Sequence, residues 1–331
     1  MTTLWDTTGT AVVKALGAER RQAGSVSSGL ALTLVVVVDE KRVAEAEQAA
    51  TRAAAEHPCR LLIVVRRRPD APEPRLDAEV LIGGRLGPGE AVVMRMYGRL
   101  ALHAESVVLP LLAPDAPVVT WWYAQPPQLI AHDPLGVLAD RRVTDCTLAP
   151  DPMAALHQRA DDYMPGDTDL AWTRATLWRA LCASALDPVD GQVTSVRVSG
   201  AADHPTRALL AGWLGSRLGL EVELEDAPAG GVTGVVLGLE DGEVRLTRGD
   251  DERTAVMVRT GQPERTLPLE RRGLGDLLAE ELRRLDPDEV YGLALEAVTG
   301  TTGLADRTEG RTHVWLDPAE TPDPDPGLTG S

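Results

Sequence analysis

Residues 30–67 contain the pattern that most constrains the fold of this chain. LALTLVVVV (30–38) is an unbroken apolar run rich in β-branched residues, which is typical of a strand buried on both faces. The alanine-rich stretch 39–57 has helical composition, and Asp39 is placed to cap it. CRLLIVVRR (59–67) is a second apolar run. Strand, helix and strand in so short a span predict a βαβ unit, with both strands parallel in one sheet.

Further apolar runs extend this sheet through the first half of the chain. They are AEVLIG (78–83), EAVVMRMYG (90–98), APVVTWWY (116–123) and RRVTDCTL (141–148). Helices are predicted at 8–21, 99–112, 134–140 and 151–164. The sequence therefore predicts an α/β domain over residues 1–165, with a Rossmann-like mixed or parallel sheet of five or six strands.

The second half has a different pattern. A strand at 192–199 and a helix at 204–220 precede three strands within 230–261, whose turns LEDGE and RGDDE indicate an antiparallel meander. Two helices follow within 273–300. We expect a smaller α+β domain over 166–312, opening with a helix rich in tryptophan and arginine. The acidic, proline-rich residues 313–331 predict a disordered tail.

The charge of the chain is unevenly distributed. Its 331 residues include 33 bases and 50 acids, a net charge of −17. Residues 1–150 hold 17 acids and 16 bases, whereas 151–331 hold 33 acids and 17 bases. Such an acidic half repels nucleic acid and anionic membranes. With no membrane-length apolar run and no signal-peptide pattern, we expect a soluble, cytoplasmic protein. Self-association is left open.

Motifs for cofactors, metals and nucleophiles are missing from the sequence. Val38 is followed by charged residues and not by the glycines that cradle a pyrophosphate, and the glycine-rich 83–90 lies between two strands, where it predicts a turn. There is no phosphate loop, no G-x-S-x-G and no metal spacing among the six histidines. Cys59, Cys146 and Cys182 are too widely spaced for a metal or redox pair and are expected to be buried thiols. We predict no catalytic residue, cofactor or metal.

The segment PGDTDLAWTRATLWRALCASALD (165–187), which we call the Trp/Arg segment, predicts a helix from about Thr168 to Leu186. Asp167 and Asp169 are placed to cap it, in preference to the metal-binding role that a D-x-D pattern also permits. Arg174 and Trp178 are four residues apart, a spacing that allows guanidinium and indole to stack. Together with Trp172 and Arg179 they form either a core face or a docking surface. Spacing alone leaves both open.

A second aromatic pair, Trp121 and Trp122, ends a predicted strand. Neighbouring residues of a strand point to opposite faces, so at least one indole belongs to the core. The other is a candidate to line a cleft at the carboxyl end of the strands, where open α/β sheets bind ligands.

The order of several pieces resembles the glucose-6-phosphate dehydrogenase assembly proteins of the OpcA type. The pieces are LWDTTGTAVVKAL, TLVVVV, EHPCRLLIVV, APVVTWWY and, above all, the Trp/Arg segment. The resemblance implies a non-catalytic protein that binds glucose-6-phosphate dehydrogenase and favours its active oligomer in the oxidative pentose phosphate pathway. On this basis six residues are hypothesised to contact the dehydrogenase: Asp167, Asp169, Trp172, Arg174, Trp178 and Arg179.

Other interpretations remain open at this stage. A sugar-phosphate or nucleotide-binding enzyme domain would need arginines at the cleft of the first sheet, and Arg60 with Arg66, Arg67 and Arg68 is the only dense cluster. A purely structural subunit would bind without changing turnover. If binding is the function, the acidic second half is an alternative contact surface, and its binding would weaken as salt rises.

Overall fold

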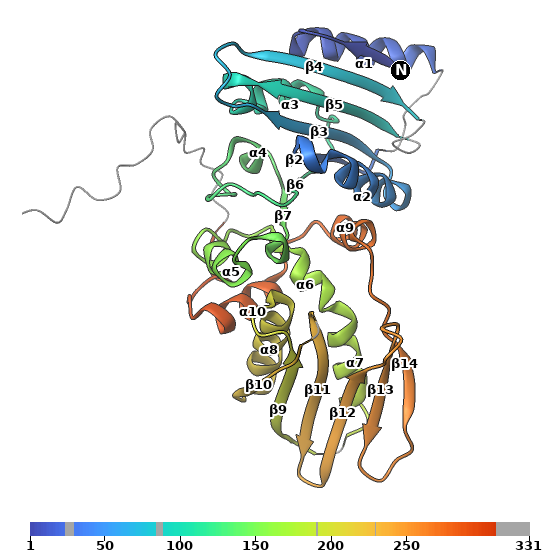
Figure 1. The fold of residues 1–331 in the computed structure, drawn as a ribbon, viewed down its shortest axis with the longest axis vertical. Helices are drawn as coiled ribbons and strands as arrows, with labels where there is room; N and C mark the ends of the chain where they lie inside the picture. The colour runs from blue at the N-terminus through green and yellow to red at the C-terminus, as the bar shows by residue number, and fades with distance from the viewer. Residues whose placement is uncertain (24–29, 84–88, 190, 229, 309–331) are drawn as a thin grey trace, which may run out of the picture.

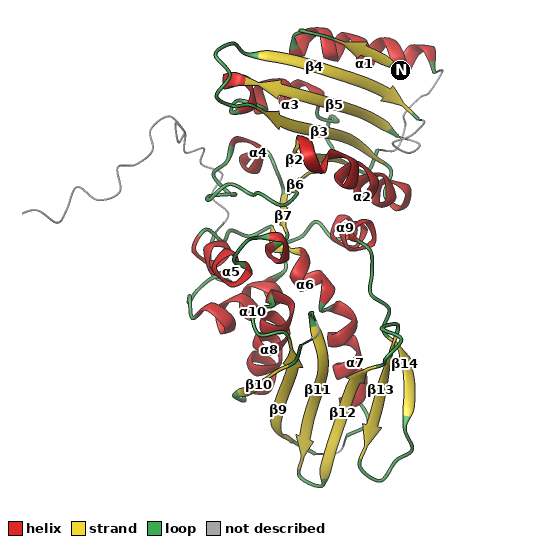
Figure 2. Cartoon of the chain, viewed as in Figure 1, coloured by secondary structure: helices red, strands yellow, loops and turns green. Residues whose placement is uncertain are grey.

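The computed structural model describes residues 1–23, 30–83, 89–189, 191–228 and 230–308. Two β-sheets lie one above the other along the long axis of the molecule, and helices pack beside each (Figure 1). Apart from β3 (Cys59–Arg67), β4 (Arg75–Ile82) and β5 (Glu90–Tyr97), strands and helices alternate around the first sheet, whereas most strands of the second follow one another directly (Figure 2).

The first sheet has eight strands within the described residues, in the order β1-β4-β5-β3-β2-β6-β7-β8. Their bounds are β1 Thr2–Leu4, β2 Leu32–Asp39, β3 Cys59–Arg67, β4 Arg75–Ile82, β5 Glu90–Tyr97, β6 Val118–Trp122, β7 Arg141–Thr144 and β8 Asp167–Asp169. The strands from β5 to β8 in this order pair in parallel with one another. Strand β4 pairs antiparallel with β5, and β1 pairs antiparallel with β4. This is the mixed, mainly parallel sheet that the sequence predicts.

The centre of this sheet follows from its apolar sequence. Strands β2 and β3 are buried on both faces along almost their whole length. Between them, Asp39 accepts hydrogen bonds from the amides of Lys41 and Arg42, at 2.9 and 3.1 Å, and so caps the turn that leads into the next helix. The predicted βαβ unit is confirmed.

Helices cover both faces of the first sheet. Helices α1 (Gly9–Gln22) and α3 (Glu105–Val108) lie on one face, and α2 (Val43–Glu56) and α9 (Leu274–Arg283) on the other. Helix α9 thus comes from the C-terminal part of the chain to pack against α2. A Cβ at Gly275 would lie 2.6 Å from the Cβ of Arg52, so glycine permits this close approach. The shared helix layer joins the two halves.

The second sheet has the order β10-β9-β11-β12-β13-β14, antiparallel except for the β10–β9 pair. Its strands are β9 Val193–Gly200, β10 Val222–Asp226, β11 Val232–Leu239, β12 Gly242–Arg248, β13 Thr254–Arg259 and β14 Arg265–Pro268. Its apolar side packs against α7 (Thr176–Leu186) and α8 (Pro205–Leu218), and α10 (Glu289–Thr299) packs on α8. The predicted meander is strands β11 to β13.

The remaining elements are short. They are α4 Pro134–Val137, α5 Pro152–Asp161, α6 Leu170–Arg174 and the 3₁₀ turns η1 Glu40–Arg42, η3 Gly98–Ala101, η4 Leu109–Leu111 and η5 Cys146–Leu148. The predicted helix 99–112 is wrong, because η3, α3 and η4 replace it. Pro110 cannot donate a backbone hydrogen bond and ends any regular helix there.

The predicted fold class is confirmed by these two sheets. The division at residue 165 stays a proposal. Strand β8, just after that position, belongs to the first sheet, and α9 packs on it. The core of the turn at 83–90 and the predicted tail 313–331 lie outside the described residues.

Candidate functional site

The Trp/Arg segment runs from the edge of the first sheet into the second half (Figure 1). It is not the single helix that its sequence predicts. Asp167–Asp169 form strand β8, helix α6 follows, and a turn at Ala175 separates α6 from α7. Extended backbone at Asp169 lets β8 pair with β7, and the Asp169 carboxylate caps α6 by accepting from the amide of Ala171 at 2.8 Å.

The two candidate aspartates, Asp167 and Asp169, are buried where the first sheet meets the second half of the chain, a region that we call the junction. Asp169 also accepts from the Thr144 hydroxyl and the Cys146 amide, at 2.7 and 2.9 Å. Burial, followed by repulsion from Asp145, raises the pKa of Asp169. Asp167 pairs with buried Arg142, and burial raises the pKa of Asp167 to about 6 against the opposing charge of Arg142. Both carboxylates are enclosed by their own chain in this structure and expose almost no surface, so their contact with a partner stays a prediction.

Trp172 is also internal, with 1% of its surface exposed. Its indole Nε1 donates to the Asp288 carboxylate at 2.8 Å, and the Arg179 guanidinium lies 3.5 Å from the ring centroid. The Tyr291 ring packs nearby, with centroids 6.0 Å apart. Trp172 is therefore a hydrogen-bonded core residue that joins the Trp/Arg segment to α10.

The predicted stacking of Arg174 on Trp178 is replaced by other contacts. The turn at Ala175 breaks the helical spacing between them. Arg174 forms a two-pronged ion pair with Asp145, at 2.8 and 2.7 Å. Trp178, 2% exposed, is buried against the second sheet, and Arg248 from β12 lies 5.3 Å from its ring centroid. Of the four Trp/Arg candidates, only Arg174 and Arg179 keep part of their side chains at the surface.

Helix α9 closes this junction with carboxylates that the sequence analysis did not single out. Glu281 accepts from the Arg141 guanidinium, with its Nε at 3.1 Å, and from the Thr173 hydroxyl at 2.5 Å. Beside it, Glu280 accepts from the Thr176 hydroxyl at 2.7 Å. Arg141 and Glu281 are both almost fully buried. This network fixes β7, α6 and α9 relative to one another, and with them the two halves of the chain.

Trp121 and Trp122 do not line a cleft. Both are fully buried, Trp121 among the residues that face α2 and α9, and Trp122 among those that face α1 and α3. Opposite orientation along β6 explains this, since helices cover both faces of the sheet there. The arginine cluster is likewise divided: Arg60 pairs with buried Glu90, Arg66 with Asp133, and Arg67 with Glu40.

The three cysteines are free and buried, as expected. Burial raises the pKa of Cys59 and Cys182 to about 12, and burial together with the nearby Asp169 carboxylate raises the pKa of Cys146 well above its ordinary value. Across the part of the chain that the structure describes, no group of three or more His, Cys, Asp or Glu side chains is placed to hold a metal. No described helix is both long and apolar enough to cross a membrane.

One tryptophan that the analysis passed over is exposed. Trp5 has 70% of its surface accessible, although the chain on its C-terminal side is held to β4. The Asp6 amide donates to the Asp77 carboxylate at 2.9 Å, and the Thr7 amide to the Leu76 carbonyl at 2.8 Å. Asp6 adopts a left-handed φ of 46°, which costs a non-glycine residue about 1 kcal/mol or more. The backbone is thus fixed while the indole projects from it.

A groove at the start of α1 begins two residues after Trp5, at Thr7. Thr7, Gly9, Val13 and Pro110 line this groove. Val13 and the neighbouring Leu109 are themselves exposed apolar residues. We call the three exposed residues Trp5, Val13 and Leu109, of which Val13 lines the groove and the other two lie next to segments that line it, the N-terminal patch. The only signal for it in the sequence is a tryptophan close to a turn, outside any apolar periodicity.

Two family models match this chain, and together they identify its family. A model described as the glucose-6-phosphate dehydrogenase subunit N-terminal domain matches residues 50–161, and one described as the C-terminal domain of the same subunit matches residues 165–295. The chain belongs to this family. The Trp/Arg segment opens the second match, and β2 precedes the first.

Individual relatives are more distant. A Synechocystis sp. protein named as OxPP cycle protein OpcA is 28% identical over 127 residues, which is 34% of this chain. The aligned part is 26% of that protein, so the chain matches about a quarter of its length.

Solved structures with a partly similar course of the chain include a ketoreductase and an oxidoreductase. KijD10, a 3-ketoreductase from Actinomadura kijaniata, has a TM-score of 0.45 at 11% identity and covers 85% of this chain and 98% of its own. An aldose-aldose oxidoreductase from Caulobacter crescentus has a TM-score of 0.43 at 10% identity, covering 83% and 98%. Likeness at this level says nothing about ligand or activity.

Proposed function

We propose that this chain is a non-catalytic assembly factor that binds glucose-6-phosphate dehydrogenase and favours its active oligomer. The observation that carries the proposal is the match of both domains of a glucose-6-phosphate dehydrogenase subunit, in order, within one chain. The name of the Synechocystis relative, which places that protein in the OxPP cycle, supports the same role.

The physical requirement for such a factor is differential binding. A protein that binds the active state of its target more tightly than the inactive state shifts the population toward the active state. A tenfold shift takes about 1.4 kcal/mol of difference. One well-placed aromatic anchor supplies an energy of this size at a protein interface.

We propose the N-terminal patch as the contact surface. Exposed tryptophan is enriched among residues that dominate binding energy, and Trp5 is held in place before binding by the bonds that fix Asp6 and Thr7. The tryptophans of the Trp/Arg segment serve a different purpose in this proposal. Through Trp172 and its partners they hold the two halves in one arrangement, so that surfaces on both are presented together.

The acidic second half offers the alternative contact. Strand β10 at the sheet edge is largely exposed and carries Glu223, Glu225 and Asp226. Binding through these charges would weaken steeply with salt, whereas binding through an indole would change little. The salt dependence of the affinity therefore separates the two surfaces.

The test is a titration of the cognate dehydrogenase with the wild-type chain, Trp5→Ala and Val258→Ala, measured by calorimetry. Val258 is an exposed apolar residue on the second sheet and is the matched control. We expect Trp5→Ala to weaken binding about tenfold or more, and Val258→Ala to leave it unchanged. Equal affinities for all three proteins would overturn the proposal that the N-terminal patch is the contact surface. The absence of binding by the wild-type chain would overturn the proposed function.

A further inference from the structure

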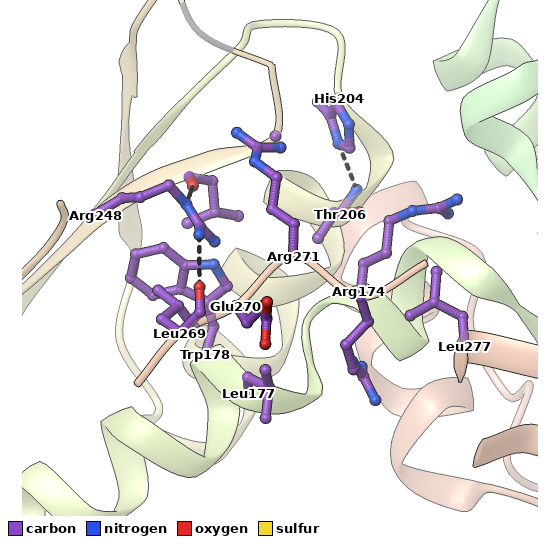
Figure 3. A pocket seen from close by; sticks show the side chains of 13 residues that line it. Arg174, Leu177, Trp178, His204, Thr206, Arg248, Leu269, Glu270, Arg271 and Leu277 are labelled. Atoms are coloured by element: carbon purple, nitrogen blue, oxygen red, sulfur yellow. Dashed lines mark hydrogen bonds between the residues drawn. The ribbon is translucent and has the colours of Figure 1, made fainter. Parts of the chain in front are cut away.

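A pocket of about 170 Å³ lies where α7, the start of α8 and the connection from β14 to α9 meet (Figure 3). Its lining is basic, with four arginines, Arg174, Arg248, Arg271 and Arg272, and one acid, Glu270. Glu270 is largely exposed and pairs outward with Arg253 at 3.0 Å. In a chain whose acids outnumber its bases by 50 to 33, this is a local reversal of charge.

Two of the four arginines are committed to buried or half-buried carboxylates. Arg174 pairs with Asp145, and Arg272 with Glu280. Arg271 has a looser partner, since Glu252 lies 3.2 Å away and its side chain is 62% exposed. Pairs of this exposed kind contribute little and are readily exchanged for another anion.

Arg248 is the least compensated cation of the group. Within the described residues it donates to main-chain carbonyls, that of Leu269 at 2.9 Å (Figure 3), that of Glu252 at 3.1 Å and that of Val232 at 3.4 Å. No carboxylate within the described residues lies at ion-pair distance from it. Burial, and then the charge of Arg271, lowers the pKa of Arg248. An anion in the pocket would offset both effects.

The opposite wall is the first turn of α8. His204 caps this helix, its Nδ1 accepting from the Thr206 amide at 3.2 Å (Figure 3). Thr206 is only 3% exposed, and its hydroxyl has no hydrogen-bond partner in the structure described. Leaving such a hydroxyl unpaired costs about 1–3 kcal/mol. A ligand oxygen in the pocket would satisfy it, at a helix end whose dipole favours negative charge.

The floor of the pocket is kept open by a glycine. Gly231 has a φ of 77°, and a Cβ built on it would lie 3.8 Å from both the His204 imidazole and the Arg271 guanidinium. A side chain at this position would therefore enter the space between those two groups. Leu177 and Trp178 add an apolar wall beside the charged one.

We propose that this pocket binds the phosphate group of a small phosphorylated metabolite. Guanidinium groups, a helix N-terminus and a hydroxyl donor together suit a tetrahedral oxyanion with several acceptor oxygens. The apolar wall suits the organic part of a phosphate monoester. Because the pocket is formed by α7, α8 and the connection to α9, a bound phosphate would link the second sheet to the helix that packs on the first. This goes beyond the proposed function and is tested without the dehydrogenase.

The experiment is calorimetric titration of the full chain with inorganic phosphate and, separately, with glycerol 1-phosphate at constant ionic strength. Arg248→Met and Thr206→Val remove the two uncommitted donors while keeping much of their side-chain volume. Arg245→Met is the matched control, because Arg245 is an exposed arginine on the same strand β12. Circular dichroism establishes that each variant is folded.

We expect one equivalent of glycerol 1-phosphate to bind, about tenfold or more weaker binding by Arg248→Met and several-fold weaker binding by Thr206→Val. Arg245→Met should bind like the wild type. Saturation by inorganic phosphate alone would overturn the organic part of the proposal and assign the pocket to free phosphate. No saturable binding of either probe, or equal weakening by Arg245→Met, would overturn it entirely.

Discussion

Replacing Glu281 by glutamine should destabilise the protein strongly. Glu281 is 6% and Arg141 3% exposed at the side chain, so the change removes the charge that compensates a buried guanidinium. Among the described residues, the Asp286 carbonyl at 2.9 Å is the other acceptor that Arg141 keeps. Removing one partner of a buried ion pair costs about 3–5 kcal/mol. The Thr173 hydroxyl, 2.5 Å from Glu281, loses a charged acceptor as well. We expect the melting temperature to fall by on the order of 10 °C.

The assay is urea unfolding followed by tryptophan fluorescence, with Asp276→Asn as the control. Asp276 is also on α9 and pairs with a base of the first half, Arg52, but both side chains are exposed, so its loss should cost about 1 kcal/mol or less. The double variant Arg141→Met, Glu281→Leu should recover most of the loss, because no uncompensated charge remains. If Glu281→Gln costs no more than Asp276→Asn, the junction does not hold the two halves together as argued.

Three further predictions concern stability and reactivity. Burial raises the pKa of Asp167 from 3.8 to about 6, so the contribution of this group to stability is present below pH 4 and is lost as pH rises toward 6. Urea unfolding should show the wild type losing stability relative to Asp167→Asn over that range. Equal pH dependence of the free energy of unfolding in the two proteins would contradict this. The three buried thiols, with raised pKa values, should not react with a disulfide reagent in the native protein but should all react in denaturant, and fast native labelling would refute it. Gly275→Ala should cost about 1–3 kcal/mol by forcing α2 and α9 apart, and unchanged thermal unfolding would argue against this close contact.

The sequence predicts those parts of the fold whose burial follows from a local apolar pattern. Strands β2 and β3 are buried on both faces, so their apolar runs need no partner to be recognised. Strands β1 and β8 have three residues each and exist because β4 and β7 offer them an edge. No local pattern of three residues indicates such a pairing.

The candidate site was harder to predict because its partners are distant in the sequence. The hydroxyl of Thr173 meets Glu281, 108 residues later, and Arg174 meets Asp145, 29 residues earlier. An apolar face with tryptophan and arginine has the same spacing whether it docks a partner or packs against its own chain. The spacing therefore leaves the burial of the Trp/Arg segment open, and exposed Trp5 carries no periodic signal at all.

We propose that this chain activates a dehydrogenase by binding it. The most direct measurement is the initial rate of the cognate glucose-6-phosphate dehydrogenase at fixed enzyme concentration, titrated with this protein at low and high salt. We expect a saturable rise in rate that changes little with salt, and we expect Trp5→Ala to need more protein to reach half-saturation. A rate that stays constant across the titration would refute activation by binding.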